Sequence, residues 1–398
     1  MRARNSGITR SSPRWPSGRS PGWVRTATFW RHGGIRVTGH LGQVRALLEQ
    51  QELDGLIITD SVNRHYCSGY SADDHAPGSP QGVLLIGRNE AILLASPNNV
   101  DWATSEAPGF TVIPWGRPWH ATVVDQVKRR AWRRVGFEDG ATTVSVYQSL
   151  QTGLGTEVTL VPLGDAVERL RIIKVPSDLA AIERALHLTE IGFTHGLRIL
   201  RPGITERVLA WEIERAMREA GADGIAFPVS VAAGPHAARP HHRVTDRAIA
   251  SGEPVVIDCG ACWAGFNGDL TRTIWLGEPD TQLRTVYNLV LEAQAAALAV
   301  LRAGLPANEA DRAARSVIEA AGFGSAFVHG LGHGLGMRVH EAPSLSAASS
   351  DILQAGMVTT VEPGVYLPGW GGVRIEDVVV IEEDGCRILT HAPKAASG

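Results

Sequence analysis

Apolar positions in the carboxy-terminal half of the chain follow two different periods, and the change between them predicts the order of elements. A helical period of three to four residues recurs in residues 178–200, 206–220, 283–303 and 308–321. A glycine follows each of these stretches, as is common after a helix: Gly203, Gly221, Gly304 and Gly322. The resulting order of helix pair, strands, helix pair and strands indicates an internal two-fold repeat.

Between the two helix pairs, two strand-like runs flank a turn-rich stretch. Residues 255–257 read Val-Val-Ile, and residues 270–276 contain three β-branched side chains, a composition typical of strands. The connection holds turn-forming residues, namely Gly260, Gly265, Asn267 and Gly268. We therefore predict a β-hairpin. Two carboxylates, Asp258 and Asp269, stand eleven residues apart on its arms, where they can face each other.

The amino-terminal half, residues 37–168, consists of shorter alternating segments. Helical spacing is seen in residues 41–52, 99–106 and 121–132. Strand-like apolar runs occupy residues 56–59, 82–86, 91–94, 110–114 and 135–138. This alternation predicts an α/β layer with a mainly parallel sheet. A boundary is expected near residues 165–178, because Pro176, Ser177 and Asp178 form a helix start signal.

Residues 1–36 differ from the rest of the chain. They are rich in Arg and Ser, and the first acidic residue of the chain is Glu49. No apolar core of 7–15 residues follows the basic start, so a secretory signal is not expected. An organelle transit peptide, a disordered tail and an upstream stretch included by a wrong start codon are the alternatives. We favour the last two and expect no fixed structure there.

Composition and charge exclude several classes of function. Of the 398 residues, 44% are hydrophobic and 20% charged, as in ordinary globular proteins. The net charge of −3 argues against nucleic acid or a membrane surface as the partner, and no apolar run approaches the ~20 residues of a spanning helix. Cys259 and Cys262 lack a second pair for a zinc site. We expect reduced, buried cysteines and a cytoplasmic protein.

Three more side chains extend the candidate site around Asp258 and Asp269. His333 lies in a glycine-rich run, Glu362 ends an apolar strand, and Glu376 stands on the next strand. Buried carboxylates need a cation or a proton. Four carboxylates with one imidazole suit a pair of divalent ions rather than copper or an iron–sulfur cluster. Manganese is the favoured metal, with cobalt, zinc or iron as alternatives.

The order of these residues resembles the pita-bread metallopeptidases, which include methionine aminopeptidase, aminopeptidase P and prolidase. The matching motifs are Asp258 and Asp269, then G-H-G-L-G at 332–336, V-E-P-G at 361–364 and R-I-E-D at 374–377. The resemblance covers residues 175–395. It implies an α+β fold with a curved antiparallel sheet, covered by helices and holding two metal ions in its concave face. Residues 37–168 resemble the α/β domain of creatinase and prolidase, which methionine aminopeptidase lacks.

The resemblance also implies roles for single residues. His241, His340 and Glu362 would be catalytic, and Glu362 would both contact a metal and act as general base. His329 and Arg374 would bind the substrate, although Arg374 could equally serve as a structural partner of the metal ligands. His242 would point away from His241, and a solvated surface histidine is the favoured interpretation for it. The glycines between His329 and His340 would leave room for a proline ring.

The expected function is that of a dinuclear exopeptidase, which hydrolyses Xaa–Pro bonds of peptides or dipeptides through a metal-bridging hydroxide. A homodimer is expected. One alternative is hydrolysis of a non-peptide C–N or amide bond, as in creatinase or an ectoine-type hydrolase. The other is a non-catalytic binding protein, which the intact ligand set disfavours. The sequence does not choose between dipeptides and longer peptides.

Overall fold

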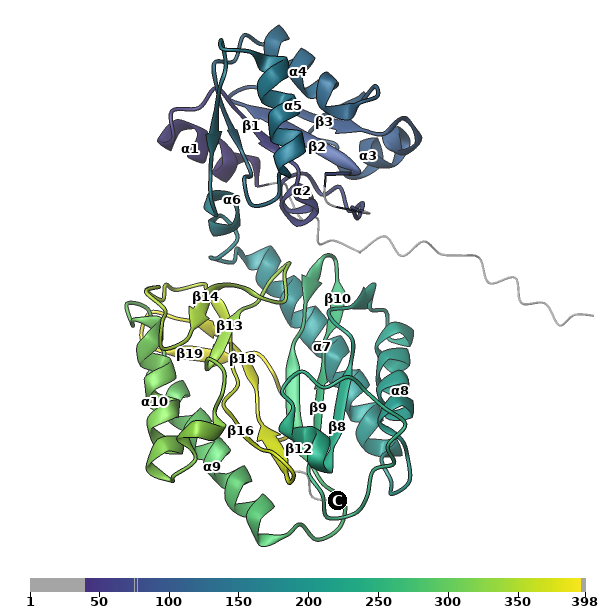
Figure 1. Ribbon diagram of the computed structural model, residues 1–398, viewed down its shortest axis with the longest axis vertical. Coiled ribbons are helices and arrows are strands. Elements are labelled where there is room, and N and C mark those ends of the chain that lie inside the picture. The colour runs from purple at the N-terminus through teal and green to yellow at the C-terminus, as the bar shows by residue number, and fades with distance from the viewer. Residues whose placement is uncertain (1–39, 75, 77, 395–398) are drawn as a thin grey trace, which may run out of the picture. The chain divides into compact units, whose positions relative to one another are not determined.

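The computed structural model describes residues 40–74, 76 and 78–394 (Figure 1). The predicted extension of residues 1–36 lies outside these residues. Within them, no helix combines the length and the apolar character needed to cross a bilayer. All four cysteines of the chain are free thiols.

A six-stranded sheet forms the centre of the amino-terminal domain. Its strands are β1 (Gly55–Ile58), β2 (Gly82–Gly87), β3 (Ala91–Ala95), β4 (Thr111–Pro114), β5 (Arg134–Phe137) and β6 (Thr159–Pro162). They are ordered β4-β3-β2-β1-β5-β6. Three neighbouring pairs are parallel, whereas β1–β2 and β2–β3 are antiparallel. Three of the five neighbouring pairs are thus parallel, as expected of a mainly parallel sheet, but the expectation missed that β2 runs antiparallel to both of its neighbours.

Helices cover both faces of this sheet (Figure 1). They are α1 (Leu41–Gln50), α2 (Ser61–Ser68), α3 (Val100–Glu106), α4 (Trp119–Arg129), α5 (Val144–Leu154) and α6 (Ala166–Arg169). Successive residues of β1 enter different cores, because side chains alternate along a strand. Ile57 packs with α4 and α5, while Leu56 and Ile58 pack with α1 and α3. The helices α2, α5 and α6 and the strand β6 were not predicted from the sequence.

The carboxy-terminal domain contains two helix pairs with antiparallel strands between them (Figure 1). The helices are α7 (Pro176–Ile199), α8 (Glu206–Glu219), α9 (Thr281–Leu298) and α10 (Ala307–Ala320). The strands are β7 (Gly224–Ile225), β8 (Ser230–Ala233), β9 (Val255–Cys259), β10 (Ala261–Trp263), β11 (Phe266–Asn267), β12 (Leu270–Ile274), β13 (Gly332–Gly334), β14 (Glu341–Leu345), β15 (Val358–Val361), β16 (Gly364–Leu367), β17 (Gly371–Arg374), β18 (Asp377–Ile381) and β19 (Cys386–Ile388).

Each half of this domain has its own hydrophobic core. The first core joins α7 and α8 to β8, β9 and β12, and the second joins α9 and α10 to β15, β17 and β18. Every strand pair in the domain is antiparallel. This arrangement confirms the expected α+β class, and it matches the predicted order of helix pairs and strands.

The predicted hairpin is formed by β9 and β12, but its connection also contains the short strands β10 and β11. In the register of the hairpin, Asp258 lies opposite Thr271. Asp269 stands immediately before β12 and has no direct cross-strand partner in this ladder. Because Asp258 pairs with Thr271, which stands two residues after Asp269, the two aspartates are diagonal neighbours across the hairpin.

Candidate metal centre

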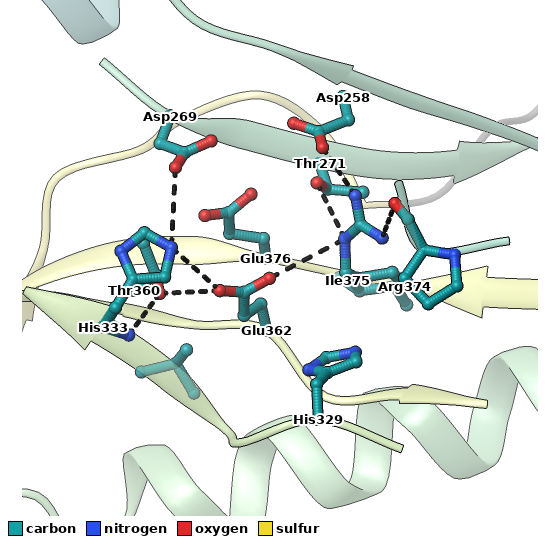
Figure 2. A network of polar contacts seen from close by, with 12 residues as sticks. Asp258, Asp269, Thr271, His329, His333, Thr360, Glu362, Arg374, Ile375 and Glu376 are labelled. Atoms are coloured by element: carbon teal, nitrogen blue, oxygen red, sulfur yellow. Dashed lines mark hydrogen bonds and ion pairs between the residues drawn. The ribbon is translucent and has the colours of Figure 1, made fainter. Parts of the chain in front are cut away.

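Two buried carboxylates and one half-buried carboxylate converge between the strands of the two halves. Asp258 lies in β9, Asp269 precedes β12, and Glu376 lies between β17 and β18. One oxygen from each lies within 4.8 Å of the others, and Figure 2 shows the three side chains pointing toward one another. Asp258 Oδ1 and Glu376 Oε1 are buried without a hydrogen-bond partner in the described part of the chain. Such oxygens are costly to bury unless a cation or proton meets them.

The pKa values of these three groups reflect that cost. Burial raises the pKa of Glu376 to about 8, and the charges of Glu362 and Asp258 add to the shift. Burial also raises the pKa of Asp269 well above its usual range, with Glu376 as the next cause. The pKa of Asp258 rises through burial despite the guanidinium of Arg374. The cluster therefore concentrates more negative charge than the surrounding protein compensates.

His333 and Glu362 lie across from this cluster (Figure 2). His333 Nε2 is 3.2 Å from Glu362 Oε1 and 3.8 Å from Asp269 Oδ2. Burial lowers the pKa of His333, but the hydrogen bond to Glu362 and the charges of Glu362 and Glu376 together outweigh burial and raise this pKa to about 9. Burial raises the pKa of Glu362, whereas His333 and Arg374 lower it to about 2. Thr360 fixes the pair, because its hydroxyl donates to Glu362 and accepts from the His333 amide, both at 3.0 Å.

The glycines beside His333 allow neighbouring strands to approach closely. A Cβ atom on Gly332 would lie 2.1 Å from the carbonyl oxygen of Thr360, and one on Gly334 would lie 2.2 Å from that of Ala342. A Cβ atom on Gly336 would likewise lie too close to the carboxylate of Glu341. The expectation that these glycines leave room for a proline ring is therefore wrong, because protein atoms occupy that space.

Arg374 stabilises one side of the carboxylate cluster. Its Nη2 donates to Asp258 Oδ2 at 2.6 Å, and its Nε donates to Thr271 Oγ1 at 3.1 Å. Its Nη1 donates to the hydroxyl of Tyr366 at 3.0 Å and to the carbonyl of Pro240 at 3.2 Å. The side chain is buried and uses most of its N–H groups within the protein. This geometry favours the role of structural partner over direct binding of a substrate.

Tyr366 is a site residue that the sequence analysis missed. Its hydroxyl lies 2.9 Å from His329 Nε2, while His329 Nδ1 lies 2.7 Å from the carbonyl of Gly330. Because a carbonyl only accepts, Nδ1 carries the proton and Nε2 accepts from the tyrosine. Burial lowers the pKa of His329, which agrees with a neutral ring. Tyr366 stands four residues after Glu362, just beyond the motif V-E-P-G, and no feature of that motif marks it.

His340 and His241 are exposed at the edge of the centre. The ring centroids of His340 and His333 are 4.1 Å apart, and burial followed by the charge of His333 lowers the pKa of His340. His241 follows Pro240, whose carbonyl contacts Arg374. His242 is buried, whereas its neighbour His241 is exposed, so the expectation of a solvated His242 is wrong. Its Nε2 lies 3.0 Å from the buried carboxylate of Glu206, a partner that the local sequence does not reveal.

The donor set fits divalent cations. Four carboxylates and one imidazole meet at the centre: Asp258, Asp269, His333, Glu362 and Glu376. Carboxylate oxygens suit hard or borderline ions, and one neutral imidazole is compatible with manganese, cobalt, zinc or iron. The two unpartnered buried oxygens point to the same conclusion, because a bound ion would satisfy both.

Comparison with known proteins agrees with this geometry. Residues 180–383 match Metallopeptidase family M24, and residues 40–173 match the Creatinase/Prolidase N-terminal domain. An uncharacterized peptidase from Bacillus subtilis, YqhT, is 39% identical, over 89% of this chain and 98% of its own. The fold is similar to that of a Xaa-Pro dipeptidase from Bacillus anthracis, with a TM-score of 0.84 and 34% identity over 89% of this chain and 98% of the other.

An X-Pro aminopeptidase from Thermotoga maritima has a TM-score of 0.80 and 32% identity, over 87% of this chain and 98% of its own. The match thus extends through both domains and nearly the full length of these relatives. Together with the convergent carboxylates, it shows that the chain is a metal-dependent peptidase with a creatinase/prolidase amino-terminal domain and belongs to metallopeptidase family M24.

Proposed function

We propose that this peptidase uses two divalent ions, manganese first among them, to hydrolyse the Xaa–Pro bond of dipeptides or short peptides. The observation that carries the proposal is the trio of converging carboxylates, two of which hold a buried oxygen without a hydrogen-bond partner among the described residues. His333 and Glu362 complete a set of five ligands, enough for two ions. When bound, such ions supply an activated water nucleophile and polarise the scissile carbonyl.

The protein side chains would divide the remaining work. Glu362 is ionised at neutral pH, because its pKa is lowered to about 2, so it can accept a proton from the attacking water. His340, exposed beside His333, would donate to the oxyanion of the tetrahedral intermediate. His241 would transfer a proton or hold the substrate carbonyl. Arg374 would keep Asp258 oriented through its 2.6 Å contact.

Specificity for proline is supported by the relatives and by the domain composition. The similar structures include an Xaa-Pro dipeptidase and an X-Pro aminopeptidase, and their amino-terminal domain is present here. Both ring nitrogens of His329 are used within the protein, so its contact with the substrate would be through the ring face. A face suits proline, which presents an apolar ring and a tertiary amide without an N–H.

A substrate panel tests the proposal. Ala–Pro, Ala–Pro–Phe and Met–Ala–Ser would be offered to the protein with manganese, cobalt or zinc. We expect cleavage of the first or second and none of the third. The ratio of the first two decides between dipeptidase and aminopeptidase. Faster cleavage of Met–Ala–Ser would contradict the proline assignment, and failure on all three would favour hydrolysis of a non-peptide amide. The homodimer and the cytoplasmic location stay predictions.

A further inference from the structure

A second group of potential metal ligands lies behind the segment that carries His241. Glu206 is the first residue of α8, and its side chain is fully buried. Three donors already orient its carboxylate: the Ala233 amide at 3.0 Å, the Thr245 amide at 3.0 Å and the Thr245 hydroxyl at 2.7 Å. The carboxylate is thus held in one position before any imidazole is considered.

Two histidines from separate segments converge on this carboxylate. His236 belongs to the short helix η2 (Gly234–Ala238), and its Nδ1 lies 2.9 Å from Glu206 Oε1. His242 is buried in the segment that follows, and its Nε2 lies 3.0 Å from Oε2. The two rings face each other with centroids 4.5 Å apart and a tilt of 32°. The three ligand atoms all lie within 4.8 Å of one another.

The number of donors around Glu206 exceeds what its oxygens accommodate. A carboxylate offers about four lone-pair sites. The amides of Ala233 and Thr245, the hydroxyl of Thr245 and the two imidazoles make five approaches. If one cation replaced the two imidazole protons, three hydrogen bonds to the carboxylate would remain. Such hydrogen bonds to a ligating carboxylate are a regular feature of metal sites.

The spacing also suits a tetrahedral ion. Zinc binds histidine nitrogen and carboxylate oxygen at about 2.0–2.2 Å, which places neighbouring ligand atoms about 3.3–3.6 Å apart in a tetrahedron. The observed nitrogen–oxygen separations of 2.9 and 3.0 Å, each to a different oxygen of Glu206, are shorter by a few tenths of an ångström or more, so the rings would move outward to admit the ion. Two histidines and one glutamate form a known zinc ligand set that leaves a fourth position for water.

We propose that Glu206, His236 and His242 bind one zinc-class divalent ion, separate from the centre at Asp258 and Glu376. The ion would tie η2 and the segment of residues 240–245 to the first turn of α8. His241 lies in that segment, so the ion would also fix the backbone that presents His241. The site is independent of the proposed peptidase chemistry, since it shares no ligand with the carboxylate cluster.

The test counts zinc in a protein whose first centre has been removed. Asp269→Ala/Glu376→Ala deletes two of the five ligands there. After equilibrium dialysis against zinc and elemental analysis, this variant should keep about one ion per chain, while the wild type binds about three. No zinc in the double variant would overturn the proposal, and it would leave Glu206 as the acceptor of an imidazole network only.

A third substitution locates the ion. In the double variant, His236→Ala should reduce bound zinc from about one to near zero. The matched control is His195→Ala, because His195 pairs with one carboxylate, Glu212, at 3.3 Å and belongs to neither group of potential metal ligands found among the described residues. Retention of the ion in both variants would contradict the assignment. If the triple variant does not fold, His236→Ala alone in the wild type should lower the count from about three to about two.

Discussion

Two buried carboxylate sites, one in each domain, look alike in their pKa values but differ in their partners. Glu138 in the amino-terminal domain and Glu376 in the metal centre are both buried, and burial raises the pKa of Glu138 to about 7 and that of Glu376 to about 8. Glu138 accepts hydrogen bonds from the Thr59 amide at 2.6 Å, the Asp60 amide at 2.8 Å and the Asn63 side chain at 2.6 Å.

Glu376 differs because its Oε1 has no such donor among the described residues and two more carboxylates lie against it. A raised pKa therefore does not by itself mark a functional group. The distinguishing feature is whether the protein supplies donors to the buried oxygens. Where donors are present, as at Glu138, the carboxylate serves the fold, and where they are missing, as at Glu376, a cation or a proton must meet the buried oxygen.

Removal of metal ligands should have the largest effect. We expect Asp269→Ala/Glu376→Ala to lower kcat/KM for Ala–Pro by roughly 10⁴-fold, because loss of the ions removes several kcal/mol of transition-state stabilisation. Glu138→Gln, the control from the other domain, should change kcat/KM by less than roughly tenfold. Equal losses in the two variants would mean that the comparison between the two sites is wrong.

Truncation of Arg374 should have the next largest effect, this time on stability. Arg374→Ala leaves Asp258 without its buried partner, and breaking a buried pair costs about 3–5 kcal/mol of unfolding free energy. The control is Arg207→Ala, which breaks an exposed pair with Asp246 and should lower the unfolding free energy far less, because solvent screens such a pair. Urea unfolding of both variants without added metal measures the difference. Similar losses would show that Arg374 does not stabilise the cluster.

Glu138 should make stability depend on pH. Its pKa is about 7 in the folded chain and near 4.5 when unfolded, so the folded state binds more protons between these values. The unfolding free energy of the wild type should therefore fall, relative to Glu138→Gln, as pH rises from 4.5 to above 7, by about 3 kcal/mol at most. Urea titrations at pH 4.5, 6 and 8 follow this difference. A difference that stays constant would place the pKa of Glu138 near its usual value.

The two exposed histidines should give the smallest effect. His340→Ala and His241→Ala should each lower kcat by roughly 10²-fold with the metal content unchanged, since neither belongs to the five proposed ligands. His391→Ala, an exposed histidine outside the centre, should leave kcat unaltered. Loss of bound metal in His340→Ala would instead identify His340 as a ligand.

The sequence was sufficient to predict those elements and site residues that a short stretch of chain specifies by itself. The helix pairs, the β9–β12 hairpin and the five proposed ligands stand in short segments whose period or motif can be read directly. The burial and the contacts of a side chain could not be predicted where its hydrogen-bond partner lies far away along the chain. His242 is buried because Glu206, 36 residues away, accepts from its ring, and Tyr366 enters the site through the distant His329. No local pattern reports such pairings.

The β2–β3 hairpin is the feature of the amino-terminal sheet that the sequence-based prediction missed. Each of its strands has the apolar composition of a buried parallel strand, because both faces of the sheet are covered by helices. Composition therefore predicted a mainly parallel sheet. The short connection between Gly87 and Ala91 is the feature that requires an antiparallel pair, since a parallel crossover needs a dozen or more residues.

The most direct test of the two-ion centre is a difference in metal stoichiometry. Metal-free wild type and Asp269→Ala/Glu376→Ala would be dialysed side by side against manganese, and bound metal would be measured by elemental analysis. The account predicts that the wild type holds about two more ions per chain than the variant, whatever other sites exist. Equal stoichiometries in the two proteins would contradict the assignment of these carboxylates as metal ligands.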